Sequence, residues 1–143
     1  MNLIPEIEAS HEEIKALRRT IHAHPELRYE EVGTAKLVAE NLERWGLEVH
    51  RGMGKTGVVG VLKRGSGKRY LGLRADMDAL PIAEINTFGH RSQNEGRMHA
   101  CGHDGHTAML LGRRNIWLST VNSTARLSSF SSRPRKAERA PRR

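Results

Sequence analysis

The densest group of reactive side chains lies at residues 98–106, where three histidines, one cysteine and one aspartate occur close together. A cysteine thiolate and a neutral imidazole are ligands for zinc and other borderline divalent ions. Cys101 and His103 are two residues apart, and Gly102 and Gly105 would let the backbone turn both toward one centre. The spacing is not that of a standard zinc finger, so a solvated histidine-rich loop with a buried, inert cysteine stays open as the alternative.

A second group places two carboxylates, Asp76 and Asp78, at the end of a predicted strand within Leu73–Pro81. Carboxylates there could bind a hard cation or hold an imidazole ligand by accepting its second N–H. Taken alone, the segment favours an aspartate-rich turn that caps its own backbone. A third group, His22 and His24, is typical on its chemistry of a solvated helix end rather than of a ligand pair.

Two helices are predicted ahead of these groups. Ser10 and Glu13 have the spacing of a capping box, so the first helix is expected at 10–24, stopped by Pro25. The second is expected at 31–45 and ends at a glycine, Gly46. The apolar stripes of the two helices are Ile14, Leu17 and Ile21, and Ala35, Val38, Leu42 and Trp45.

Strands follow the helices. Residues 47–49 suggest a short strand, and 57–62 and 70–74 suggest two more, joined by a glycine-rich turn and expected to pair antiparallel. A polar loop at 86–102 leads to a third helix beginning at 106. Helices followed by strands indicate a mixed α/β layered domain whose chemistry lies at strand ends.

The net charge of +8 is unevenly distributed. Residues 113–143 hold nine of the 24 Lys and Arg residues and one of the 16 Asp and Glu residues, so residues 1–112 are neutral. The basic segment is rich in serine and has no sustained period, which is typical of a disordered tail. One cysteine excludes an internal disulfide, and the sequence shows neither a signal peptide nor a membrane span. A cytoplasmic location is therefore expected.

Together these motifs resemble a family of amidohydrolases that includes hippurate hydrolase, bacterial N-acyl-amino-acid hydrolases and plant auxin-conjugate hydrolases. The matching segments are His22–Leu27, Leu73–Pro81 and Met98–Leu110. The resemblance covers residues 1–112, less than half of the family's usual length. It implies an N-terminal part of a mixed-sheet, metallopeptidase-like catalytic domain, whose complete form carries an inserted dimerisation domain.

The resemblance also implies an activity and a site. Two divalent ions, zinc or manganese, would activate a water that hydrolyses the amide of a small N-acyl amino acid. Cys101 and His103 match the metal ligands, with the cysteine placed to bridge, and Asp76 and Asp78 match a supporting shell. The family pattern continues with a Gln-Pro-Ala-Glu-Glu-Gly segment, whose first glutamate is the general base and whose second is a ligand. Neither glutamate is found here, so this chain is expected to be inactive.

The missing segment can be read in another frame. In that frame, each new codon takes its first base from the third position of one residue's codon and its other two bases from the first two positions of the next residue's codon. Read in this way, the codons of residues 112–116 can spell Ala-Ala-Lys-His. Residues 131–138 can spell Gln-Pro-Ala-Glu-Glu-Gly-Gly without a break. We expect a frameshift near Gly112, equivalent to the loss of one base.

Two other functions stay open. The basic tail could bind nucleic acid or another acidic surface in a salt-dependent way, but it lacks interleaved aromatic residues. Residues 1–112 could instead act as a metal-binding fragment that uses Cys101 and His103 without catalysis.

Overall fold

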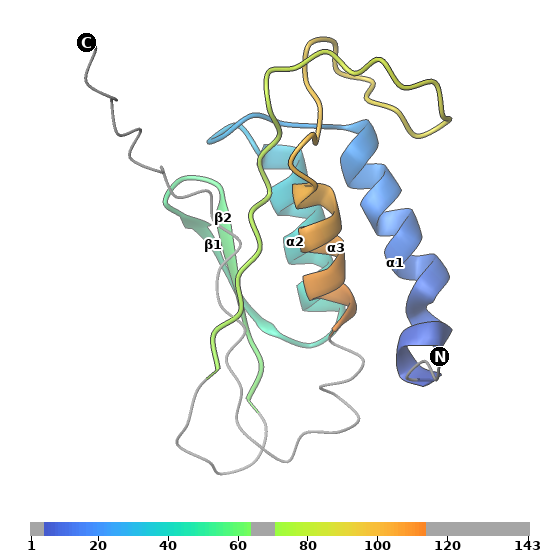
Figure 1. The fold of residues 1–143 in the computed structure, drawn as a ribbon. Helices are drawn as coiled ribbons and strands as arrows, with labels where there is room; N and C mark the ends of the chain where they lie inside the picture. Colours follow the sequence, from blue (N-terminus) through green and yellow to red (C-terminus); the bar gives the residue numbers. More distant parts are fainter. Residues whose placement is uncertain (1–4, 64–70, 114–143) are drawn as a thin grey trace, which may run out of the picture.

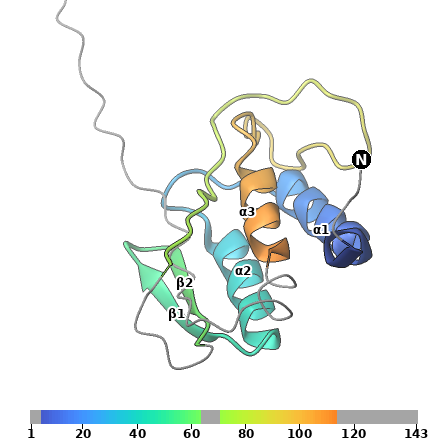
Figure 2. The same ribbon diagram turned by 60° about the horizontal axis from the view of Figure 1, so that its bottom comes forward.

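A computed structural model describes residues 5–63 and 71–113. The elements are α1 (Pro5–Ala23), α2 (Val32–Arg44), β1 (Glu48–Met53), β2 (Gly57–Val61) and α3 (His103–Gly112). Figures 1 and 2 show α3 between α1 and α2, with the β1–β2 hairpin against the far side of α2. The long segment after residue 80 arches over the end of the helical layer where α3 begins. The mixed α/β class is confirmed.

Helix α1 begins at Pro5, five residues before the predicted start, so the capping-box prediction is wrong. Proline suits the first position of a helix, and Glu6 and Glu8 in the first turn favour the helix dipole. The Ser10 hydroxyl donates back to the carbonyl oxygens of Glu6, at 3.0 Å, and Ile7, at 3.1 Å. Ser10 therefore lies inside the helix and caps nothing.

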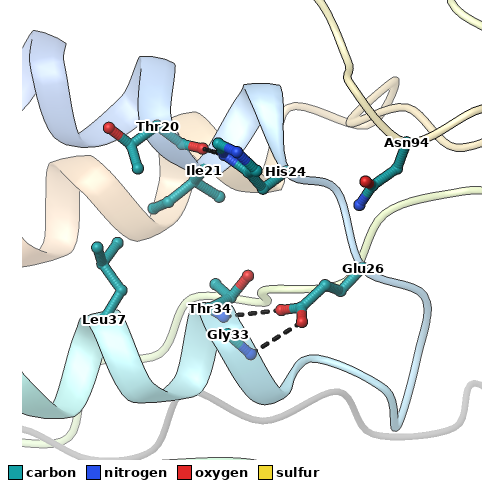
Figure 3. A pocket seen from close by; sticks show the side chains of 8 residues that line it. All are labelled: Thr20, Ile21, His24, Glu26, Gly33, Thr34, Leu37 and Asn94. Atoms are coloured by element: carbon teal, nitrogen blue, oxygen red, sulfur yellow. Dashed lines mark hydrogen bonds between the residues drawn. The ribbon is translucent and has the colours of Figure 1, made fainter.

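Helix α2 agrees with its prediction. Its first free amides are capped from a distance by Glu26, whose carboxylate accepts the Gly33 and Thr34 amides at 2.8 and 2.7 Å (Figure 3). At the other end the chain leaves through Gly46 with a φ of +76°, a left-handed conformation that costs glycine little.

The strand pairing differs from the prediction. β1 and β2 form an antiparallel hairpin in which Glu48 lies opposite Val61, with an irregularity between Arg51 and Met53. Residues 71–74 form no strand, and β2 pairs with the strand before it instead of the segment after it. The predicted turn at 64–68 lies outside the described residues.

The apolar core fills the space between α2, α3 and the hairpin. Its most buried members are Val38, Leu42, Val58, Met77 and Leu111, each at most 1% exposed. The α2 stripe was predicted correctly, since Val38, Leu42 and Trp45 are all buried. Gly60 lets β2 approach α2 closely, because an added Cβ would lie 3.1 Å from a Leu42 methyl group.

Helix α3 begins three residues before its predicted start, so that His103 is its first residue. The preceding stretch has no regular helix or strand, as predicted for 86–102. Within the described ranges, no helix is long and apolar enough to cross a membrane. The predicted disordered tail falls on residues 113–143, all but the first of which lie outside the described ranges.

Candidate metal centre

Cys101 and His103 lie at the start of α3. Gly102, between them, is the N-cap residue and has a φ of +77°, which lets the loop turn sharply into the helix. The turn is closed by two backbone hydrogen bonds, from the Gly102 amide to His99 and from the His106 amide to Gly102, both 3.1 Å. The Cys101 thiol is free and exposed. The alternative of a buried, inert cysteine is therefore wrong.

The His103 imidazole is oriented by Asp78. Its Nδ1 lies 2.9 Å from the Asp78 backbone oxygen and 3.0 Å from the Asp78 Oδ1. A carbonyl oxygen can only accept, so Nδ1 carries the proton and donates it. In the neutral ring, Nε2 then keeps the lone pair that a metal ion requires. Arg28 lies 3.8 Å from the other Asp78 oxygen and offsets its charge.

Asp76 is placed differently from Asp78. Its carboxylate accepts hydrogen bonds from the neighbouring Arg74, with Nε at 3.0 Å from Oδ1. Its backbone oxygen accepts the hydroxyl of Thr107, which ties this segment to α3 at 3.1 Å. The sequence predicted the same supporting role for both aspartates. The structure brings only Asp78 against His103.

The donor set is incomplete in the described part of the chain, where no group of three or more His, Cys, Asp or Glu side chains could hold a metal ion. Cys101 and His103 supply a soft thiolate and an imidazole, which is the chemistry of a zinc site. His106 is exposed, and its ring centroid lies 5.7 Å from that of His103. The described residues therefore fit part of a metal site that needs further ligands.

His22 is buried, so the prediction that it belongs to a solvated helix end is wrong. Its side chain is only 9% exposed and lies between two carboxylates. Nδ1 is 2.9 Å from Asp104 Oδ2, and Nε2 is 3.0 Å from Glu84 Oε1. His24 does match the prediction, because it is exposed and bonds only to the Thr20 carbonyl in the same helix.

Burial lowers the pKa of His22, but the hydrogen bonds to Glu84 and Asp104 outweigh this and raise it above 6.5. Burial raises the pKa of Glu84, yet hydrogen bonds from Asn86, His22 and the Ser92 amide bring it to about 2. Ionised carboxylates only accept hydrogen bonds, so the imidazole donates from both nitrogens and is an imidazolium.

Asp104 links this network to α3. Its Oδ2 also accepts from Arg18 Nε at 3.1 Å, so the carboxylate is shared by two cations. Burial raises the pKa of Asp104, but the bonds from His22, the Gly105 amide and Arg18 lower it overall. Asp104 is in the first turn of the helix, where the dipole also favours a negative charge.

His99 lies beside this network with its ring centroid 6.3 Å from that of His22. It is 4% exposed, and neither ring nitrogen has a hydrogen-bond partner among the described residues. Burial lowers the pKa of His99 to about 4, so the ring is neutral. The Asp104 Oδ1 is likewise buried without a partner. Segment 99–104, which carries Cys101 and His103, therefore also holds buried polar atoms without a hydrogen-bond partner among the described residues.

The pocket in Figure 3 is a separate feature. It encloses about 360 Å³ between the end of α1 and the start of α2, and neither Cys101 nor His103 lines it. Its Glu26 carboxylate is already used as the α2 cap. Sequence reasoning missed Glu84 and Asp104 as the buried partners of His22, because they lie 62 and 82 residues away from it in the chain. The only local signal was the position of Asp104 next to His103.

Comparison with known proteins places this geometry in a family. Residues 72–116 match Peptidase family M20/M25/M40. The chain is 55% identical over 111 residues to the hippurate hydrolase of Campylobacter jejuni, covering 78% of this chain and 29% of that protein. It is 53% identical over 106 residues to an N-acyl-L-amino acid amidohydrolase of Geobacillus stearothermophilus, covering 73% of this chain and 28% of that protein.

The fold gives the same result. A Bacillus subtilis protein described as a dinuclear metal binding peptidase from the M20 family matches with a TM-score of 0.79 and 36% identity. The match covers 86% of this chain and 35% of that protein. This chain thus spans less than a third of the curated relatives' length and aligns with their N-terminal part. By sequence motifs and fold together, the chain belongs to peptidase family M20/M25/M40.

Proposed function

We propose that this chain is the N-terminal part of an enzyme that hydrolyses the amide bond of small N-acyl amino acids, with Cys101 and His103 as metal ligands. One observation carries the assignment. The His103 Nδ1 proton is donated to Asp78. The lone pair of Nε2 is therefore available to a metal ion, two residues from an exposed thiol. The relatives named for hippurate and N-acyl-amino-acid hydrolysis support the substrate class.

Each described residue has a defined part in this proposal. Cys101 would supply a thiolate and His103 an imidazole, while Asp78 fixes the tautomer and the orientation of the imidazole. A pair of zinc or manganese ions would supply an activated water and a polarised carbonyl. The partial ligand set fits the description of the B. subtilis neighbour as dinuclear. A glutamate from a later segment would have to take the proton and pass it to the leaving amine.

We further propose that residues 113–143 are read in a shifted frame. The basis is the uninterrupted Gln-Pro-Ala-Glu-Glu-Gly-Gly that residues 131–138 can spell, in the order the family pattern requires. On this account the 143-residue chain has no general base and should not turn over hippurate. Loss of a positioned base alone costs roughly 10²–10⁴-fold in rate. Metal-dependent turnover by the purified chain would contradict it.

The ligand assignment can be tested on the chain as it exists. Cadmium ion prefers thiolates, and its binding is followed by the thiolate-to-cadmium absorption band. We expect Cys101→Ser to abolish the band and His103→Gln to weaken binding. His106→Gln is the matched control, since His106 is a neighbouring exposed histidine. Equal cadmium binding by the Cys101→Ser variant and the original chain would refute the assignment.

A further inference from the structure

His22 connects two points that lie on either side of the candidate site in the sequence. Glu84 precedes the segment that carries Cys101, and Asp104 directly follows His103. Both carboxylates bond to the same imidazole, at 3.0 and 2.9 Å, and their side chains are 2% and 1% exposed. His22 comes from the end of α1, 62 residues before Glu84 and 82 before Asp104.

We propose that His22 is a positioning residue that holds both ends of segment 84–104 and so fixes Cys101 relative to His103. This inference rests on the proposed function, because it concerns the geometry of the same ligand pair. Glu84, His22 and Asp104 are named below as the imidazole clamp.

The clamp acts on a segment that lacks regular structure. Residues 84–102 contain no helix or strand, so their order depends on individual ties. Two ties from the middle of the segment reach the same end of α1, from the Gln93 amide to Ala23 and from the Asn94 side chain to Pro25. The clamp joins the two ends of the segment, because Glu84 and Asp104 bond to the same imidazole. This restricts the conformations of the loop, and with them the spacing of Cys101 and His103.

The chemistry of the clamp suits a fixed geometry. His22 hydrogen-bonds through both nitrogens of one rigid ring, at 2.9 Å to Asp104 and 3.0 Å to Glu84, so the two carboxylates are held at a fixed separation. Arg18 holds the Asp104 carboxylate from a second direction, so the carboxylate has little freedom to rotate. Asp104 belongs to the first turn of α3, and a shift of its carboxylate would move His103 with the helix end. A ligand pair needs this fixed spacing to bind one ion.

The experiment compares His22→Gln with His24→Gln in the full 143-residue chain. His24 is the matched control, because it directly follows the same helix end but is exposed, and among the described residues its side chain bonds to the Thr20 carbonyl oxygen alone. Amide hydrogen exchange at Gly102 and His106 reports the order of the loop, since both amides close its turn. Cadmium affinity, read from the thiolate band, reports the spacing of the ligand pair.

We expect His22→Gln to speed exchange at Gly102 and His106 and to weaken cadmium binding about tenfold, the lower end for an outer-shell partner. His24→Gln should change neither. A general loss of stability is controlled by Leu42→Ala, which damages the apolar core outside the imidazole clamp and should leave cadmium affinity unchanged. If His22→Gln does not fold by circular dichroism, Glu84→Gln removes one arm of the clamp and takes its place.

The outcomes separate this inference from the proposed function. Unchanged loop exchange and cadmium affinity in folded His22→Gln would overturn the positioning role. An equal loss of affinity in Leu42→Ala would also overturn it, because the effect would then be one of stability alone. If the original chain binds no cadmium through Cys101, the ligand assignment fails, and faster exchange in His22→Gln would still support the clamp as the device that orders the loop.

Discussion

Different kinds of interaction hold the two ends of α3. At its C-terminal end, Leu110 and Leu111 enter the apolar core beside Val38 and Leu42. At its N-terminal end, Asp104 is held by His22 and Arg18, and His103 by Asp78. The apolar end gains from the area removed from water, whereas the polar end depends on a few hydrogen bonds of defined direction.

The two ends of α3 should therefore lose stability in different ways when a side chain is removed. An apolar core loses stability in proportion to the volume removed, and the loss is nearly independent of pH. A buried ionic network loses more than one bond when one member is removed, because its partners keep uncompensated charges. The core should therefore govern global stability, and the network should govern the local geometry and the pH dependence.

The largest expected effect is on the core. Leu42 is 1% exposed and packs within the cluster that joins α2, the hairpin and α3. Leu42→Ala should lower the free energy of unfolding by about 2–5 kcal/mol. Urea unfolding followed by circular dichroism measures this. A loss below about 1 kcal/mol would show that this core does not carry the stability.

The next effect concerns the clamp and depends on pH. His22→Gln should destabilise the protein by about 1–3 kcal/mol near pH 6, because two carboxylates lose a charged donor. The pKa of His22 is raised above 6.5, so its contribution is full below pH 6.5 and is lost as the pH rises through the raised value. The pKa values of Glu84 and Asp104 are lowered, so their contributions are lost only in acid.

The difference in stability between the original chain and His22→Gln should therefore be largest at about pH 5–6.5 and shrink above neutrality. His99 titrates with the opposite sign, because its pKa is lowered, but it is present in both proteins and cancels in the difference. Urea titrations at several pH values measure the profile. A difference that grows with rising pH would contradict a charged His22.

A smaller effect should separate the two aspartates. Asp78→Asn weakens the hydrogen bond that orients His103, so cadmium affinity should fall by roughly 10–100-fold. Asp76→Asn is the control, because its carboxylate is paired with Arg74 and does not contact His103. Cadmium titrations on both variants give the comparison. An equal loss of cadmium affinity in the two variants would contradict the separate roles of Asp78 and Asp76.

The smallest predicted effect is at the α2 cap. Glu26→Gln keeps an acceptor oxygen but removes the charge that holds the Gly33 and Thr34 amides (Figure 3). We expect a loss of about 0.5–1 kcal/mol in the free energy of unfolding, with no change in cadmium affinity. A change in metal affinity would mean that this end of the molecule is coupled to the candidate site.

Local patterns predicted what local forces decide. The α2 stripe and the Gly46 stop were recognised because helical period and left-handed glycine both act within a few residues. The prediction for Ser10 was wrong because a serine hydroxyl can either cap the start of a helix or donate to a carbonyl oxygen one turn earlier. Since α1 begins at Pro5, Ser10 lies inside the helix and its hydroxyl bonds to the earlier carbonyl oxygens. The strand at 70–74 was predicted from composition, but pairing depends on which neighbour comes into register.

The candidate site divides in the same way. Cys101 and His103 were singled out from residue type and spacing, whereas the family resemblance implied one supporting role for Asp76 and Asp78 and did not say which of them meets His103. The burial of His22 could not be read from the sequence around it, since it depends on carboxylates 62 and 82 residues away. A histidine in the last turn of a helix is ordinarily solvated, and only tertiary packing reverses that expectation for His22.

The most direct test of the whole account is to restore one base near the Gly112 codon and assay the resulting longer protein on hippurate. The new frame should pass through Ala-Ala-Lys-His and Gln-Pro-Ala-Glu-Glu-Gly, and the protein should hydrolyse the amide only with a divalent metal. Cys101→Ala in that protein should abolish activity. Full activity in the Cys101→Ala variant would contradict the proposed metal centre, and a frame that closes soon after the glutamate pair would contradict the expected recovery of activity.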